Sequence, residues 1–256
     1  MTRHRIRFPV SESEHLDQDE TYFYVTEGGE EIRLRFHDYG EIYDRPGLYE
    51  QLFYERLQCD SPRKVASILK SAVEQAGENY TTLRVLDLGA GNGIMGEELR
   101  QLGVARLLGA DIIPEAKDAC LRDRPELYDD YYVCDFADPD KELLAELESW
   151  GLDCLTTVAA LGFGDIPPQA FVNAFNLIKP GGWVAFNIKQ TFLDHRETAL
   201  LNQTIRDLVF TDYLEIHHLE RYRHRLSIDG APIFYYAIAG VKTADVPEDL
   251  FLTVEE

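Results

Sequence analysis

The sequence predicts an α/β fold: a doubly wound, mostly parallel seven-stranded sheet with an antiparallel C-terminal hairpin strand, preceded by an N-terminal helical cap. From about residue 83, short apolar runs alternate with helical patterns, as expected for strands joined by crossover helices. Near the end, two long extended runs flank an Asp-Gly turn, which is typical of a hairpin. Residues 1–80 lack this alternation, so we expect a cap or lid there and the core domain in residues 81–256.

The N-terminal segment is predicted to combine one hairpin with helices. Residues 1–20 are charged and show no regular apolar pattern. Alternating residues around a glycine-containing turn predict a β-hairpin within residues 22–36. An amphipathic helical stretch follows in residues 46–57. Ser61 is the expected N-cap of the next helix, which begins with a proline and ends at Gly77.

The core elements follow in strict alternation. The expected strands cover residues 83–88, 106–110, 131–134, 152–158 and 182–188. The expected helices cover residues 94–102, 114–121, 138–150, 168–178 and 194–210, and Asp138-Pro139 caps the third of them. The closing extended runs cover residues 213–226 and 232–242. The predicted sheet is parallel but finishes with a hairpin. This topology distinguishes the fold from one in which strands and helices alternate to the end.

Composition narrows the range of partners. The chain has 256 residues and a net charge of −21, and its apolar share of 45% is enough for a packed core. Such a charge repels phosphate backbones, so no nucleic-acid partner is expected. The most apolar run, residues 233–241, is too short to span a bilayer, and the N-terminus lacks the apolar segment of a secretory signal. We therefore expect a cytoplasmic protein with a small-molecule partner and no membrane partner.

Metal and disulfide sites are not expected. The four cysteines form no CxxC pair and have no accompanying histidine spacing, which argues against a zinc site or a disulfide framework. Neighbouring His217 and His218 have no third ligand nearby in the sequence, so we expect no metal site there.

A glycine-rich loop follows the first strand of the predicted core. It reads Val-Leu-Asp-Leu-Gly-Ala-Gly-Asn-Gly over residues 85–93 and opens a helix. Glycines allow a sharp turn and a close approach of backbone to a ligand. Gly91, Gly93 and Gly96 formally match the dinucleotide pattern GxGxxG, which binds pyrophosphate. Asp87, however, immediately precedes the loop, and a carboxylate there suits a ligand with a cationic end better than a pyrophosphate.

Three aspartates end successive strands of the predicted sheet. They are Asp87, Asp111 and Asp135, at intervals of 24 residues. The carboxyl ends of parallel strands share one edge of an open sheet, which is where such folds bind ligands. Asp111 is placed to accept both hydroxyls of a ribose. This feature is common to both interpretations of the loop, as a site for a dinucleotide or for a ligand with a cationic end. Asp135 is placed to accept an adenine amino group, with Phe136 packed on the ring.

These motifs together resemble the class I S-adenosylmethionine-dependent methyltransferases. The loop in residues 85–93 resembles the first motif of that family, Asp111 its ribose-binding acid, and Asp135-Phe136 its adenine-binding pair. Residues 177–183 resemble its turn into the fifth strand, and the final hairpin its antiparallel seventh strand. The resemblance implies a Rossmann-like sheet and S-adenosylmethionine as cofactor. It also implies that the cofactor is contacted by Tyr43, Asp87, Gly89, Ala90, Gly91, Gly93, Asp111, Ile112, Asp135, Phe136 and Ala159.

The acceptor side is less specified. The stretch after the fourth core strand, residues 156–164, lacks the signatures of adenine-amino, cytosine-C5 or metal-dependent catechol methylation. Tyr39 and Tyr43 precede the core where small-molecule members of the resembled family place lid tyrosines, so we expect them to contact the acceptor. His37 is a possible base, because it lies close in sequence to these tyrosines, but a structural role is the favoured interpretation of a lone histidine. The basic cluster in residues 221–225 fits either an acidic group on the acceptor or a solvated strand face, and the second interpretation is favoured.

The sequence therefore predicts an S-adenosylmethionine-dependent methyltransferase. Methyl transfer to a small molecule is an in-line displacement, in which the protein mainly aligns the two reactants. A non-catalytic cofactor-binding partner and a protein methyltransferase remain as alternatives. The sequence assigns no catalytic residue, no acceptor and no oligomeric state.

Overall fold

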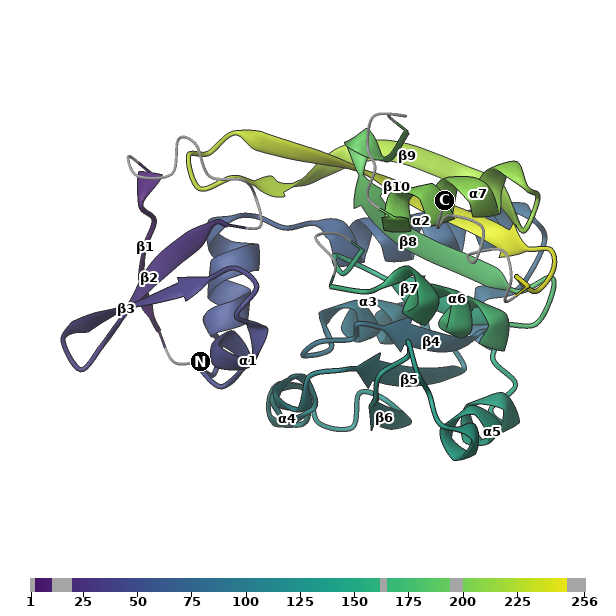
Figure 1. Ribbon diagram of the computed structural model, residues 1–256, viewed down its shortest axis with the longest axis horizontal. Helices are drawn as coiled ribbons and strands as arrows, with labels where there is room; N and C mark the ends of the chain where they lie inside the picture. Colours follow the sequence, from purple (N-terminus) through teal and green to yellow (C-terminus); the bar gives the residue numbers. More distant parts are fainter. Residues whose placement is uncertain (1–2, 11–19, 162–164, 194–199, 248–256) are drawn as a thin grey trace, which may run out of the picture.

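The structure, a computed structural model, describes residues 3–10, 20–161, 165–193 and 200–247. Among these residues, the main sheet has the strand order β6-β5-β4-β7-β8-β10-β9 (Figure 1). Its strands are β4 (Arg84–Leu88), β5 (Arg106–Asp111), β6 (Asp130–Val133), β7 (Cys154–Thr157), β8 (Trp183–Lys189), β9 (Leu214–Leu226) and β10 (Pro232–Lys242). Strands β4 to β8 are parallel, and β10 is antiparallel to both β8 and β9. The predicted fold class and the closing hairpin are confirmed.

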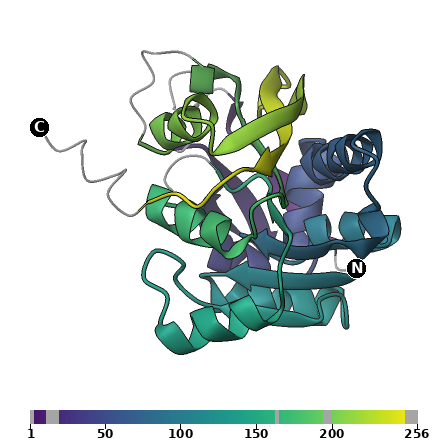
Figure 2. The ribbon, with the colours of Figure 1, turned by 90° about the vertical axis from the view of Figure 1, so that its right-hand side faces the viewer.

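Helices cover both faces of this sheet (Figure 2). They are α2 (Ser61–Gln75), α3 (Ile94–Leu102), α4 (Pro114–Asp123), α5 (Lys141–Ser149), α6 (Pro168–Leu177) and α7 (Leu200–Phe210). Helices α2 and α3 pack with Val85 in one apolar cluster, whereas α5, α6 and α7 pack with Leu86 in another. Successive side chains of β4 thus point to opposite faces, as strand geometry requires. The predicted start of the last helix at Asp194 lies outside the described residues.

The N-terminal elements form a separate small sheet. It contains β1 (Arg5–Arg7), β2 (Tyr22–Glu27) and β3 (Glu30–Arg35), all antiparallel. The predicted hairpin is confirmed as β2–β3. Strand β1 was not predicted, because three residues are too short to show alternation; its Ile6 is buried in the apolar cluster that this sheet forms with the following helices. Helix α2, although it precedes residue 80, packs on the main sheet.

The helices before α2 differ from a regular amphipathic pattern. A short α1 (Tyr39–Tyr43) is followed by η2 (Glu50–Arg56), which is a π-helix. Two 3₁₀ turns, η3 (Tyr80–Thr82) and η4 (Gln190–Leu193), complete the described elements. Apolar spacing indicates a helix in residues 46–57 but does not distinguish a π-helix from an α-helix, since the two differ by one residue per hydrogen bond. Such π-helical turns are rare and often lie at functional sites.

Two predicted helix caps need correction. Asp60, not Ser61, precedes α2, and no side chain caps this helix; Ser61 is its first helical residue. The Ser61 hydroxyl instead joins a buried polar network, described below. Helix α5 is capped by Asp140, whose carboxylate accepts a hydrogen bond from the Leu143 amide at 2.8 Å, rather than by Asp138. In both places, the sequence offered neighbouring residues of equal capping propensity.

The β9–β10 hairpin connects the two parts of the molecule. Its tip extends toward the small sheet (Figure 1), and Ile228 packs in the same cluster as Ile6. The Leu226 amide donates a hydrogen bond to the Leu57 carbonyl at 2.7 Å, and the Asp60 amide donates to the His224 carbonyl at 3.0 Å. The hairpin tip is therefore part of the cap, while its other end belongs to the core.

Candidate functional site

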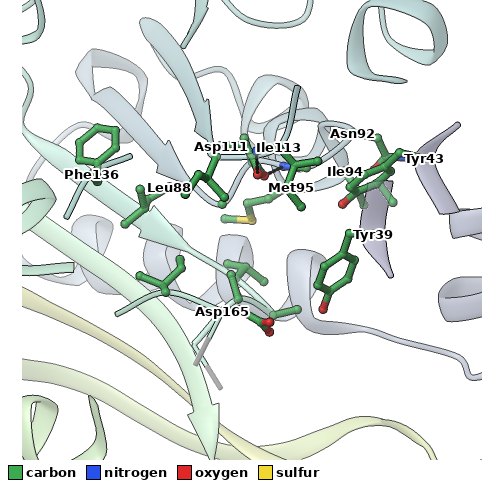
Figure 3. A pocket seen from close by; sticks show the side chains of 18 of the residues that line it. Tyr39, Tyr43, Leu88, Asn92, Ile94, Met95, Asp111, Ile113, Phe136 and Asp165 are labelled. Atoms are coloured by element: carbon green, nitrogen blue, oxygen red, sulfur yellow. Dashed lines mark hydrogen bonds between the residues drawn. The ribbon is translucent and has the colours of Figure 1, made fainter. Parts of the chain in front are cut away.

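A cavity lies at the C-terminal edge of the parallel strands, between these strands and the cap (Figure 3). The loops after β4, β5, β6 and β7 form one wall, and α1 and η2 form the opposite wall. The residues predicted from sequence that line it are Tyr39, Tyr43, Gly89, Ala90, Gly91, Asp111, Ile112, Asp135, Phe136 and Ala159. The topology thus brings together segments that are up to 120 residues apart, as the strand-end rule predicts.

The glycine loop is held in a fixed conformation. The amides of Gly89 and Ala90 both donate hydrogen bonds to the Ala110 carbonyl, and the Tyr131 hydroxyl donates to the Gly91 carbonyl at 2.7 Å. Gly91 has a φ of +54°, and a Cβ atom there would lie 2.5 Å from the Tyr43 hydroxyl oxygen. Glycine is therefore required, because any side chain would collide with Tyr43 and occupy the cavity.

Asp111 is the acid nearest to this loop. Its carboxylate accepts hydrogen bonds from the Gly91 amide at 2.8 Å and from the Ile113 amide at 3.1 Å. Burial nevertheless raises its pKa, and the backbone amides act in the opposite direction. Each carboxylate oxygen keeps a further acceptor position, so Asp111 still has the capacity to bind hydroxyl groups.

The next strand ends supply a polar and an apolar group. Asp135 is exposed, and it accepts a hydrogen bond from the Ala137 amide at 2.8 Å. Phe136 lines the far end of the cavity (Figure 3), yet most of its ring belongs to the core. Ile112 is 57% exposed and lines the cavity, so it offers an apolar surface to the face of a planar ring.

Asp87 differs from the sequence-based expectation. It is 1% exposed and does not line the cavity. Its two oxygens accept hydrogen bonds from the Tyr128 hydroxyl and the Thr156 hydroxyl, both at 2.8 Å. Burial raises its pKa to about 7. Because both oxygens are buried against Tyr128 and Thr156, the geometry does not support Asp87 as a direct ligand; its carboxylate joins β4 to β7 and to Tyr128.

Gly93 also lies outside the cavity wall. It is the N-cap of α3 with a φ of +90°, and a Cβ atom there would lie 2.7 Å from Leu127 Cδ2. Its role is therefore to form the turn into α3 rather than to contact a ligand.

Tyrosines of the cap form the opposite wall. Tyr43 is buried against Ala116 and Ala119 of α4, and its ring lies 5.0 Å from that of Tyr49. Tyr39 stacks on Tyr43, with 6.3 Å between the ring centres, and points into the cavity (Figure 3). Tyr49 and Tyr54 also line the cavity, which their helical spacing did not indicate. Tyr49 directly precedes η2 and Tyr54 lies within it, so both rings reach the cavity from this segment.

A buried polar network fixes the loop after β7. Ala159 has a φ of +58°, and its amide donates a hydrogen bond to Asn187 Oδ1 at 2.7 Å. The Asn187 amide group donates to the Tyr222 hydroxyl at 2.9 Å and to Ser61 Oγ at 3.2 Å. Ser61 Oγ lies 2.6 Å from His224 Nδ1. The network thus joins the cavity to α2 and β9, and burial lowers the pKa of His224 to about 3.

A second, smaller cavity adjoins the first. The two share Tyr39, Tyr49, Ala159 and Asp165. Here His37 Nδ1 lies 3.1 Å from Asp165 Oδ1, which joins residues 128 positions apart. Sequence reasoning missed Asp165, because it follows β7 by eight residues rather than ending the strand. Asp165 and Tyr39 lie across the first cavity from Asp111 (Figure 3).

The basic cluster on β9 divides into exposed and buried members. Arg221 and Arg223 are exposed, which agrees with a solvated strand face. Arg225 is only 7% exposed and lines the second cavity, so the interpretation as a solvated face was wrong for this residue. The cause is the hairpin tip, which packs against the cap and covers Arg225 beneath Phe36.

Fold and site together define a class of protein. A parallel sheet that ends in this hairpin, with a glycine loop and strand-end acids around a cavity, is the architecture of class I S-adenosylmethionine-dependent methyltransferases. The residues present fit that cofactor: Asp111 retains acceptor positions for hydroxyl groups, Ile112 offers an apolar face, and Gly91 leaves space that a Cβ atom would fill.

The chain belongs to the family described as Methyltransferase domain, whose model matches residues 57–226. The protein is similar to the ubiquinone biosynthesis O-methyltransferases of Burkholderia thailandensis, at 34% identity over 104 residues, and of Nitrosococcus oceani, at 32%. These matches cover 41% of this chain, and 43% and 42% of the two relatives. The matched region therefore spans less than half of the curated relatives.

Solved structures show the same fold. The N-methyltransferase NodS from Bradyrhizobium japonicum, in complex with S-adenosyl-L-homocysteine, matches with a TM-score of 0.56 and 16% identity over 82% of this chain and 98% of that one. The magnesium protoporphyrin IX methyltransferase from Synechocystis, with bound S-adenosylmethionine, matches with a TM-score of 0.50 and 15% identity over 71% and 79% of the two chains. S-adenosylmethionine is the cofactor of this fold family, as the sequence predicted.

Proposed function

We propose that the protein is an enzyme that transfers the methyl group of S-adenosylmethionine to a small-molecule acceptor. The observation that carries this proposal is the second cavity, which shares four lining residues with the first and is covered by the cap. Its walls include buried Phe36 and Arg225, so it suits a compact molecule rather than a protein or nucleic-acid surface. The net charge of −21 also disfavours nucleic acid.

The cofactor contacts are proposed from the lining of the first cavity. Asp111 is assigned to the ribose hydroxyls, Asp135 to the adenine amino group, and Ile112 and Phe136 to the faces of the ring. The remaining contacts are Tyr43, Gly89, Ala90, Gly91 and Ala159. Asp87 and Gly93 are assigned to support of the loop, because neither lines the cavity.

The residues of the chain contribute mainly alignment and exclusion of water. When bound, S-adenosylmethionine supplies an activated methyl group on a sulfonium. The cap tyrosines cover the junction of the two cavities, and the strained Ala159 backbone is held there by Asn187. Alignment of this kind can lower a barrier by ~7–11 kcal/mol.

The His37–Asp165 pair is the best placed general base for a hydroxyl or ammonium group on the molecule that receives the methyl group. Asp165 fixes the orientation of the His37 imidazole, as a hydrogen-bonded carboxylate does for a catalytic histidine. The similarity to O-methyltransferases of ubiquinone biosynthesis favours an oxygen nucleophile. We expect His37→Gln to lower the rate of methyl transfer, while S-adenosylhomocysteine affinity is unchanged.

The test uses extracts of cells that carry the gene, incubated with the purified protein and S-adenosylmethionine labelled in the methyl group. We expect label in the fraction of low molecular mass, and less of it with Asp111→Ala. Label that stays in precipitated protein would show a protein methyltransferase instead. Label in neither fraction, despite tight binding of S-adenosylhomocysteine, would favour a non-catalytic binder.

A further inference from the structure

The second cavity contains a buried cation, Arg225, that has no acidic partner in the part of the chain that the structure describes. Arg225 is 7% exposed, and its guanidinium donates one hydrogen bond, from Nη1 to the Leu226 carbonyl at 2.9 Å. No carboxylate lies within ion-pair distance of it among the described residues. The guanidinium carbon also lies 5.4 Å from the centre of the Phe36 ring. A guanidinium has five N–H donors, so most of the donor capacity of Arg225 is unused.

This arrangement is costly unless a ligand completes it. Removing a charge from water without pairing it destabilises the folded protein, and burial correspondingly lowers the pKa of Arg225. Arg221 and Arg223, on the same strand, avoid this cost by remaining exposed. Another buried cation of the same chain, Lys242, has three carbonyls and Asp245 as partners.

The other charged and titratable groups of the cavity do not neutralise Arg225. Asp165 contacts His37 rather than Arg225, and Tyr39, Tyr235 and Cys59 are kept neutral because burial raises their pKa values. His224, stacked on Tyr235, is also neutral because its pKa is lowered to about 3. The Arg225 guanidinium therefore keeps donors available for a ligand, and a planar carboxylate matches a guanidinium fork bidentately.

We propose that the acceptor carries a carboxylate, which Arg225 binds in the second cavity while another group of the same molecule faces the cofactor. The proposal rests on the methyltransferase function proposed above. A monoanion fits better than a phosphate, because a second negative charge would stay unpaired beside Asp165. The aromatic walls, including Phe36 and Tyr235, favour an apolar or aromatic body for the acceptor.

The test compares benzoate with benzamide, which have nearly the same shape but differ in charge. Each is titrated calorimetrically at pH 7.5 into protein saturated with S-adenosylhomocysteine. We expect benzoate to bind at least tenfold more tightly than benzamide. Arg225→Gln should abolish this preference, whereas the matched control Arg223→Gln, at an exposed position on the same strand, should keep it. Arg225→Lys retains the charge and should keep part of the preference if Arg225→Gln does not fold.

Equal affinities for benzoate and benzamide in the unmodified protein would overturn the proposal. It would also be overturned if the preference survived in Arg225→Gln or was lost in Arg223→Gln. A second measurement separates this inference from the proposed function: labelled product from the extract experiment is applied to an anion exchanger. Retained label supports the carboxylate. Label in an unretained small molecule contradicts the carboxylate but leaves the methyltransferase function intact.

Discussion

The two ends of the β9–β10 hairpin each bury a cation, and the two cations have opposite surroundings. Lys242, at the core end, is fully buried and donates hydrogen bonds to the carbonyls of Phe175, Asn176 and Ile178, with Asp245 as its ion-pair partner. Arg225, at the tip, donates one hydrogen bond to its neighbour along the chain. Lys242 thus completes the C-terminal end of α6, whereas Arg225 faces a cavity.

The difference separates a structural charge from a ligand-binding one. A buried charge whose donors are all used is costly to disrupt and has no capacity left for a ligand. A buried charge with unused donors lowers stability and gains its partner only on binding. Substitutions at the core end should therefore change stability alone, and substitutions around the cavities should change binding or rate.

The largest effect is expected for Lys242→Met. Methionine fills a similar volume but leaves the three carbonyls without their donor, so the free energy of unfolding should fall by about 3–4 kcal/mol. Urea denaturation measures this change, and calorimetry on the folded variant should show unchanged S-adenosylhomocysteine affinity. The exposed Lys179→Met is the matched control. A loss of affinity without a loss of stability would reverse the assignment of this end of the hairpin.

Asp87 extends the comparison to a buried anion. Its pKa is raised to about 7 from an ordinary value near 4, so between these values the folded state binds more protons than the unfolded state. Stability therefore falls as pH rises through this interval, and the cost is fully present above pH 7. Asp87→Asn removes the cost. As pH rises from 4 to 8, the free energy of unfolding of this variant should therefore increase relative to wild type by roughly 2–4 kcal/mol.

The measurement is thermal or urea unfolding of both proteins at matched pH values. Asp129→Asn provides the control, because hydrogen bonds with Leu107 and Arg100 lower the pKa of Asp129. Its difference from wild type should stay constant between pH 5 and pH 8. A constant difference for Asp87→Asn over the same interval would show that Asp87 is ionised throughout.

Asp111→Ala tests the cavity wall. Loss of its carboxylate should weaken S-adenosylhomocysteine binding by ~1.5–3 kcal/mol, the range for hydrogen bonds to a charged group. Asp153→Ala is the control, since Asp153 lies at the other edge of the sheet and bonds the Arg84 amide at 2.7 Å. It should lower stability without changing affinity. Equal losses of affinity in both variants would show that the functional edge of the sheet has been assigned incorrectly.

Tyr43→Ala should have the smallest effect that is still clearly measurable. We expect methyl transfer, measured on the acceptor found by labelling, to fall more than tenfold, or more than ~1.4 kcal/mol of transition-state stabilisation. The effect on S-adenosylhomocysteine affinity should be smaller. Tyr80→Ala, which removes a buried tyrosine far from the cavity, controls for lost packing. A normal rate per folded molecule in Tyr43→Ala would make Tyr43 a packing residue only.

The sequence by itself determined the sheet, its closing hairpin and the glycine loop. These follow from local rules: alternation fixes strands and helices, and parallel strands place Asp111 and Asp135 at one edge whatever the details of packing. The cap was only partly predictable. Three residues are too few to reveal β1, and apolar spacing did not show that Tyr49 and Tyr54 reach the cavity from a π-helix.

Only the tertiary structure decided which charged groups are covered and which are available. Asp87 belongs to the glycine-loop motif. Tyr128 and Thr156 nevertheless donate hydrogen bonds to its oxygens, and it lies behind the cavity wall. Arg225 belongs to a basic cluster that looks solvated, yet the hairpin tip buries it beside Asp165. Burial and partners depend on contacts between segments more than a hundred residues apart, such as His37 with Asp165, and no local pattern encodes them.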